Sequence, residues 1–283
     1  MQRVMVQLHP NGVAAPAQVA ATTAMHVVSH FLQHLDDADL AAPTSATHSI
    51  GYRFSFNEMS RDQLKQLYQN WLLSKGFQGL AQGVRESLEE AYLYVRLAEM
   101  KSAKTTWGHF QESVASVRRR ATKRNFPQLL AEVNTGLREP LHFEAEFLSM
   151  QKARNCLEHR RGIVSDDDLE SGCNSLILSF PRLKIFYKRD DHEIEVVPGE
   201  VIDTHNVVSP HERNNGAAGT EIPIFLRREI RRVSFALGDR ITFSIQEFNE
   251  IAAACHFFAA DLAGKLPVLP PPLDTAAEDA SKE

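Results

Sequence analysis

The sequence predicts a mainly α-helical protein, an antiparallel helical bundle with a β-rich insertion before the last helix and therefore α+β overall. Apolar side chains recur at spacings of three and four residues from about residue 60 to residue 157, and again over residues 244–265. Between these regions lie the runs "NSLILSF", "LKIFYK" and "EIEVV", whose β-branched and aromatic residues are typical of antiparallel strands. We therefore expect the helices to form the main core.

Composition divides the chain into five predicted regions. Residues 1–57 form a poorly specified N-terminal leader, and residues 58–170 form the helical bundle. Residues 171–243 form the β-rich insertion subdomain, and residues 244–265 form the closing helix of the bundle. Residues 266–283 are Pro-rich and then acidic, so we expect a disordered tail.

The overall composition limits the compartment and the partners. The 283 residues carry a formal charge of −5, so any contact with RNA has to come from a local basic patch. The three cysteines, Cys156, Cys173 and Cys255, are too few and too scattered for a disulfide framework or a zinc site. The chain shows no signal-peptide pattern and no apolar run approaching the roughly 18 residues of a membrane span. These features predict a cytoplasmic protein with no membrane partner and no cofactor.

Helix boundaries follow from capping residues. Ser60 and Gln63 form a capping box, and we expect the helix that follows to end within residues 74–76. Asn125 is suited to cap a short helix that closes at Gly136. The helices expected before the insertion cover residues 60–73, 80–98, 110–117, 126–136 and 140–161.

Two further local signals concern the insertion and the last helix. The sequence "VSFALGDRITFSI" predicts a tight hairpin around Gly238 and Asp239, and residues 203–220 read as a long loop. Ser244 and Glu247 form a second capping box, which starts the clearest amphipathic helix of the chain.

The stretch "KARNCLEHRRGIV" carries the residues with the most specific chemistry. On an ideal helix Glu158, Asn155 and His159 lie about 40°, 100° and 140° from Arg154, so these four polar side chains share one arc. Arg154 itself lies at the edge of an apolar stripe, where a charge needs a partner or a ligand. The stripe consists of Phe143, Phe147, Met150 and Leu157.

This arc is suited to phosphoryl transfer on RNA without a metal. His159 has the side chain best matched to proton transfer near neutral pH, to or from a ribose 2′-hydroxyl or a 5′-oxygen. Arg154 offers a planar fork of donors to non-bridging phosphate oxygens, and Asn155 can orient the phosphate or the imidazole. The expected products are a 2′,3′-cyclic phosphate and a 5′-hydroxyl end.

The pattern Arg-Asn-x-x-x-His resembles the motif helix of the HEPN superfamily, and a chance match is expected in only about 0.03 of shuffled chains of this composition. The resemblance covers roughly residues 58–164 and 244–265, and it is sharp only over Arg154 to Gly162. By position it implies that Arg154, Asn155 and His159 are the catalytic residues of a metal-independent RNase. It also implies a homodimer in which two motif helices face each other, and a role in antiviral (phage) defence or in a toxin–antitoxin system.

A non-catalytic interpretation stands beside this one. Arg154 can instead be a structural residue that pairs with Glu158, or with Glu86 or Glu89 across the bundle. The alternative function is a HEPN-like module that dimerises or binds a nucleotide or a protein. In either case the large β-rich insertion is a candidate surface for a protein partner or an inhibitor.

Basic and histidine-rich stretches give weaker signals. The segment "VRRRATKRN" is the best candidate for contacting an RNA backbone, although a solvated helix face is the more common explanation of such a charge run. Arg160 and Arg161 are further candidates for RNA binding, while together with His159 they also suit an ordinary helix C-terminus. His26, His30 and His34 have a spacing that can bind a metal, but no matching ligands lie nearby, so we predict no metal site. The candidate RNA contacts in the first segment are Arg118, Arg119, Arg120, Lys123 and Arg124.

Overall fold

The computed structural model describes residues 8–35, 59–100, 106–169, 172–189, 192–196 and 223–268. These residues form six α-helices and one three-stranded antiparallel sheet. The prediction of a mainly helical protein with a small antiparallel β part is therefore confirmed. The predicted loop at 203–220 and most of the predicted tail lie outside the described residues.

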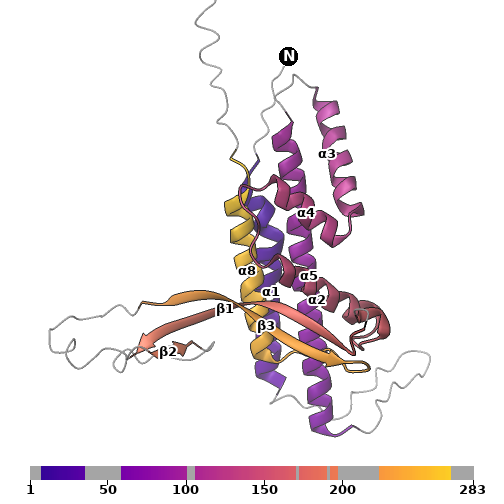
Figure 1. The fold of residues 1–283 in the computed structure, drawn as a ribbon, viewed down its shortest axis with the longest axis vertical. Helices are drawn as coiled ribbons and strands as arrows, with labels where there is room; N and C mark the ends of the chain where they lie inside the picture. Colours follow the sequence, from indigo (N-terminus) through magenta and orange to yellow (C-terminus); the bar gives the residue numbers. More distant parts are fainter. Residues whose placement is uncertain are drawn as a thin grey trace, which may run out of the picture.

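Three long helices form the main part of the bundle: α1 (Pro10–Leu35), α2 (Arg61–Glu99) and α8 (Ile245–Lys265). Small side chains let α1 approach α2 closely, because Ala17 and Ala21 are completely buried. A Cβ added at Gly83 of α2 would lie 2.3 Å from the Cβ of Ala20. The region predicted only as a poorly specified leader thus supplies a helix of the core (Figure 1).

The predicted break at residues 74–76 is wrong, because α2 runs through it without interruption. The capping box of Ser60 and Gln63 does start the helix, as predicted. Gly76 does not end it: a Cβ at this position would lie 2.7 Å from the ring of Phe248 on α8. The glycine therefore permits close helix packing, and the cost of glycine inside a helix is only about 1 kcal/mol.

Three shorter helices follow α2, namely α3 (Trp107–Lys123), α4 (Phe126–Gly136) and α5 (Glu144–His159). Asn125 caps α4 as predicted and accepts a 2.9 Å hydrogen bond from the backbone of Gln128. The helix α5 begins later than the predicted residue 140. The preceding segment is instead tied to α8, where Asp261 accepts a 3.0 Å hydrogen bond from the backbone of His142.

The strands β1 (Ser175–Arg189), β2 (His192–Glu195) and β3 (Phe225–Ala236) form a sheet in the order β2-β1-β3. β1 and β3 run across the bundle and project to one side of it (Figure 1). At the ends of β1 and β3 that lie on the bundle, Leu178, Phe180 and Phe235 belong to the same apolar core as the helices. The sheet is thus anchored on the bundle at one end.

The predicted hairpin around Gly238 and Asp239 has a different partner from the expected one. The chain does turn here, and Asp239 donates a 3.0 Å backbone hydrogen bond to Ala236. After the turn it pairs with the segment that follows α5: Val164 donates to Asp239 at 2.9 Å, and Ile241 donates to Gly162 at 2.8 Å. The alternating pattern indicated extended backbone, but nothing local in it specifies which segment it bonds to.

Candidate functional site

The middle of the helix α5 is held by contacts with the core, with β1 and with α2. Met150 and Ala153 are buried in the core, and Ser149 accepts a 2.8 Å hydrogen bond from the backbone of Ser179 on β1. Gln151 donates a 3.0 Å hydrogen bond to the backbone carbonyl of Ala81 on α2. With these faces occupied, the polar residues near the end of the helix lie on its remaining side.

The polar arc, defined as Arg154, Asn155, Glu158 and His159, contains one ion pair. Arg154 Nη2 lies 2.6 Å from Glu158 Oε2, and its Nη1 donates a 3.3 Å hydrogen bond to Asn155 Oδ1. The Arg154 side chain is 26% exposed, which agrees with its predicted place at the edge of the apolar stripe. Of the partners considered from the sequence, Glu158 is the one the guanidinium contacts.

Asn155 and His159 are exposed to solvent at the end of α5. Within the described part of the chain, the His159 ring has no hydrogen-bonding partner. An imidazole in this state can meet a substrate from solution. Among the described residues, however, no carboxylate bonds to the ring to fix its tautomer and orientation.

On the other side of the same helical turn, Cys156 and Arg160 have structural roles. Cys156 is fully buried and fills the core, and burial raises the pKa of its thiol, which disfavours the reactive thiolate. Arg160 Nε donates a 2.8 Å hydrogen bond to Asp168 Oδ2. Burial would raise the pKa of Asp168, but hydrogen bonds from Ser165 and Arg160 outweigh it and lower that pKa. Arg160 is therefore engaged in its own chain, which weakens its candidacy as an RNA contact.

The end of α5 has an unusual backbone at Arg161. The N–H of Gly162 donates a 3.0 Å hydrogen bond to the carbonyl of Cys156, six residues earlier, and so satisfies one of the last carbonyls of the helix. The left-handed residue that follows a helix is usually glycine, yet here the first such residue is Arg161, with φ of 55°. Gly162 follows with φ of 77°. The predicted helix end is correct, but a charged residue occupies the position where glycine is favoured.

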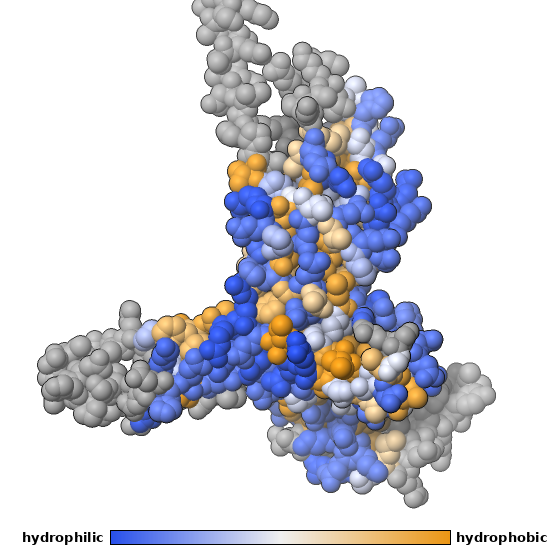
Figure 2. Space-filling view, viewed as in Figure 1, coloured by the Kyte–Doolittle hydropathy of each residue, from blue (hydrophilic) through white to orange (hydrophobic). Residues whose placement is uncertain are grey.

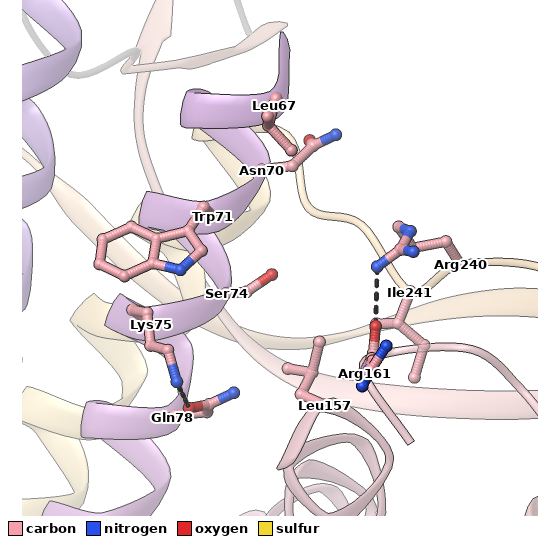
Figure 3. Close-up of a pocket in the computed structure, with 10 residues that line it drawn as sticks. All are labelled: Leu67, Asn70, Trp71, Ser74, Lys75, Gln78, Leu157, Arg161, Arg240 and Ile241. Atoms are coloured by element: carbon pink, nitrogen blue, oxygen red, sulfur yellow. Dashed lines mark hydrogen bonds between the residues drawn. The ribbon is translucent and has the colours of Figure 1, made fainter. Parts of the chain in front are cut away.

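A hollow of about 370 Å³ lies beside this turn. Figure 3 shows its two walls, one from α2 and one from the turn after α5 together with the segment after β3. We call it the basic hollow, because its lining includes Lys75, Arg161 and Arg240. None of the described residues that line it is acidic. The full lining is Leu67, Asn70, Trp71, Ser74, Lys75, Gln78, Leu157, Arg161, Arg240 and Ile241.

The basic hollow and His159 lie on different sides of α5. Leu157 lines the hollow, and on an ideal helix it is about 60° from Arg154 but about 160° from His159. The structure therefore brings Arg161 into the hollow and leaves the imidazole of the polar arc outside it. Sequence reasoning missed Trp71 and Lys75 of α2 and Arg240, because α2 and the segment after β3 are distant in the sequence and carry no local motif.

Within the described residues, the predicted basic segment at the end of α3 divides into residues with an ion pair and residues without one. Arg118 pairs with Glu90 at 3.1 Å, and Arg124 pairs with Glu132 at 2.9 Å. The remaining members, Arg119, Arg120 and Lys123, are exposed. This segment is remote from the polar arc in the sequence and no described contact joins the two, so its role in RNA binding remains a prediction.

The histidines of α1 form no described metal site. His26, His30 and His34 are exposed, and the rings of the last two are 4.8 Å apart between centroids in an edge-to-face arrangement. Over the described ranges, no group of three or more His, Cys, Asp or Glu side chains is placed to bind a metal. None of the described helices is long and apolar enough to cross a membrane.

The part of the β1–β3 strand pair that projects from the bundle has two different faces. On one face Arg182 contacts Glu229 at 2.7 Å and Glu250 of α8 at 3.0 Å. On the other face Ile185 and its cross-strand partner Leu226 are 39% and 54% exposed. Figure 2 shows apolar and polar side chains side by side along this projecting part of the sheet. A protein partner for this part of the sheet stays a prediction.

Comparison with known proteins adds no assignment: no family model, no curated protein and no solved structure matches this chain. The function therefore has to be argued from the residues themselves.

Proposed function

We propose that this protein is a metal-independent endoribonuclease of the HEPN type, with the polar arc at the end of α5 as its reaction centre. The observation that carries the proposal is that Arg154, Asn155 and His159 share one accessible surface, while the rest of the helix is packed against α2 and β1. Three residue types suited to RNA cleavage thus remain available to solvent on a rigidly held helix.

The reaction requires two proton transfers. The ribose 2′-oxygen attacks phosphorus, the bond from phosphorus to the 5′-oxygen breaks, and a 2′,3′-cyclic phosphate and a 5′-hydroxyl result. One group takes the proton of the 2′-hydroxyl and another gives a proton to the 5′-oxygen. The polar arc of one chain supplies a single imidazole, so the proposal includes a homodimer in which two copies of His159 serve one phosphate. The two Arg154 guanidinium groups would stabilise the charge that develops on the phosphate oxygens.

A second candidate is a non-catalytic module that dimerises or binds a nucleotide or a protein. It is favoured by the ion pair of Arg154 with Glu158 and by the packing of α5 on β1 of its own chain. In this case the polar arc would be a dimer interface or a solvated helix end, and His159 would have no proton to transfer.

RNA cleavage in EDTA separates the two candidates. Wild type, Arg154→Ala, His159→Ala and the control His256→Ala are incubated with mixed RNA, and the new ends are mapped. His256 is an exposed histidine of α8, so its replacement removes an imidazole outside the polar arc. We expect cyclic phosphate ends from wild type and from the control. The His159 and Arg154 variants should lose activity by about 100-fold or more.

Three results would contradict the proposal. If wild type binds RNA but does not cut it, the module is the better assignment. If His159→Ala cuts as fast as the His256 control, the imidazole of the polar arc is not part of the reaction. Sedimentation of the wild-type protein gives its oligomeric state, and a monomer at the concentration of the cleavage assay would refute the two-imidazole mechanism.

A further inference from the structure

The cations of the basic hollow differ from the neighbouring arginines of α5 in how they are partnered. Lys75 Nζ donates a 2.9 Å hydrogen bond to Gln78 Oε1, and Arg240 Nη1 donates a 2.7 Å hydrogen bond to the carbonyl of Arg161. Both acceptors are neutral, and across the described ranges none of the hollow's three cations pairs with a carboxylate. The neighbouring Arg154 and Arg160 each have one. In a chain with a net charge of −5, three cations without acidic partners around one hollow form a local site of positive potential.

The backbone at Arg161 gives a second, independent observation. A non-glycine residue in the left-handed region is strained, and such strain concentrates at functional sites. The same left-handed turn would form at lower cost with glycine here. The arginine side chain therefore has a use that is not part of ending the helix, and the hollow is where that side chain lies.

Arg240 is held in place by the pairing of its segment with the turn after α5. Its neighbours Asp239 and Ile241 are bonded through their backbones to Val164 and Gly162, at 2.9 Å and 2.8 Å. The backbones of Arg240 and Arg161 are thus held side by side on one wall of the hollow before any ligand arrives. Preorganised donors lose less conformational freedom on binding an anion.

The other wall supplies an aromatic surface. Trp71 of α2 lines the hollow and is 61% exposed, which is unusual for the largest side chain of a folded protein. An accessible indole offers a face on which a nucleobase can stack, worth about 1–3 kcal/mol in single-strand-binding proteins. The amide and hydroxyl groups of Asn70, Ser74 and Gln78 lie on the same wall (Figure 3).

We propose that the basic hollow binds a nucleotide, with its phosphate at Lys75, Arg161 and Arg240 and its base against Trp71. The volume of about 370 Å³ falls within the roughly 300–1,000 Å³ of small-molecule sites. The nucleotide is either free in solution or part of a single-stranded RNA, since both present the same phosphate and base. The site does not rest on the proposed nuclease reaction, because it lies on the other side of α5 from His159.

Tryptophan fluorescence offers a direct test, because the chain has only two tryptophans. Trp107, on α3, is replaced by phenylalanine, so that Trp71 becomes the single reporter in the full chain. AMP, a short oligo(A) RNA and inorganic phosphate are titrated in turn, with affinities measured in parallel by calorimetry. We expect AMP or the oligonucleotide to bind and to quench Trp71. Quenching by AMP points to a free nucleotide, and quenching by the RNA alone points to a nucleotide within a chain.

Three substitutions locate the site. Arg161→Gly and Arg240→Gln should each weaken binding about tenfold or more, since each removes a charge-assisted hydrogen bond to phosphate. Arg232→Gln is the control, because it removes an exposed arginine of β3 that does not line the hollow. Equal affinity of the Arg161 and Arg240 variants and the control would overturn the proposal. Binding of inorganic phosphate, or of an acidic peptide, in the absence of any nucleotide binding would overturn it as well.

The nuclease and the nucleotide site can fail separately. Nucleotide binding is measured in the His159→Ala background as well as in wild type, and we expect equal affinities. A protein that binds AMP or RNA at Trp71 but never cuts RNA supports the basic hollow and removes the nuclease. A protein that cuts RNA without binding any nucleotide at Trp71 supports the nuclease and excludes the basic hollow as a nucleotide site.

Discussion

Replacing Arg161 with glycine should make the protein more stable. At φ of 55° the arginine occupies the left-handed region, which costs a residue with a Cβ about 1–2 kcal/mol and costs glycine nothing. Glycine also adds conformational freedom to the unfolded chain, which offsets about 0.4–1 kcal/mol of this gain. The exposed side chain has no ion pair in the described structure that would be lost. We therefore expect a net stabilisation of about 0.5–1 kcal/mol, which for a chain of this size raises Tm by roughly 1–3 °C.

The neighbouring residue, Gly162, provides a control, because its substitution should lower the stability of the protein instead of raising it. Gly162 has φ of 77°, and a Cβ added there would lie 3.1 Å from Leu157 Cδ2. Gly162→Ala should therefore destabilise the protein by about 1 kcal/mol or more. Urea unfolding followed by circular dichroism measures both changes. The reasoning fails if Arg161→Gly lowers the unfolding midpoint, because the arginine would then be stabilising the turn that we describe as strained.

Two further predictions test the packing of the bundle. Gly83→Ala should destabilise the protein by about 1–2 kcal/mol, because the added Cβ would lie 2.3 Å from a side-chain carbon of α1. Gly79→Ala, whose Cβ would have nothing within 4 Å, should stabilise the same helix by up to about 1 kcal/mol. Equal denaturation midpoints for the two variants would contradict the close contact between α1 and α2. Asp261→Asn should cost about 3 kcal/mol at neutral pH, since the 6% exposed carboxylate contacts Lys265 at 2.9 Å and His142 at 2.7 Å. Burial alone would raise the pKa of Asp261, but hydrogen bonds from His142 and Lys265 hold that pKa below its ordinary value. The carboxylate therefore stabilises the fold at neutral pH and loses its effect as the pH falls below about 4, so the difference in Tm between wild type and variant should narrow on acidification.

Local signals in the sequence predicted local structure well. The capping boxes at Ser60 and Ser244 start α2 and α8, and Asn125 caps α4, because each of these signals concerns a side chain and a backbone group three residues apart. The predicted break near Gly76 failed for the opposite reason. Glycine has the same appearance in a sequence whether it ends a helix or admits a ring from another helix, and only the position of Phe248 distinguishes the two.

The candidate site shows the same limit. Periodicity on one helix predicted that Arg154, Asn155, Glu158 and His159 share an arc, since that depends only on the helical repeat. The basic hollow could not be predicted, because Trp71 and Arg240 are distant in sequence and meet only through the pairing of the segment after β3 with the turn after α5. The strain at Arg161 was equally hidden, since "RRG" also fits a helix whose first left-handed residue is the glycine.

The ion pair between Arg154 and Glu158 bears directly on whether the polar arc can act on a phosphate. Both side chains are about a quarter exposed, at 26% and 29%, and a pair of this kind is worth roughly 0.2–1 kcal/mol. A hydrogen bond from a charged group contributes about 1.5–3 kcal/mol, so a phosphate ester can displace or share the carboxylate. The pair therefore lowers the affinity for a phosphate without preventing its binding. The missing second imidazole is the larger obstacle, because no rearrangement of one chain's polar arc supplies it. The proposed reaction thus depends on a second copy of α5 more than on the release of Arg154.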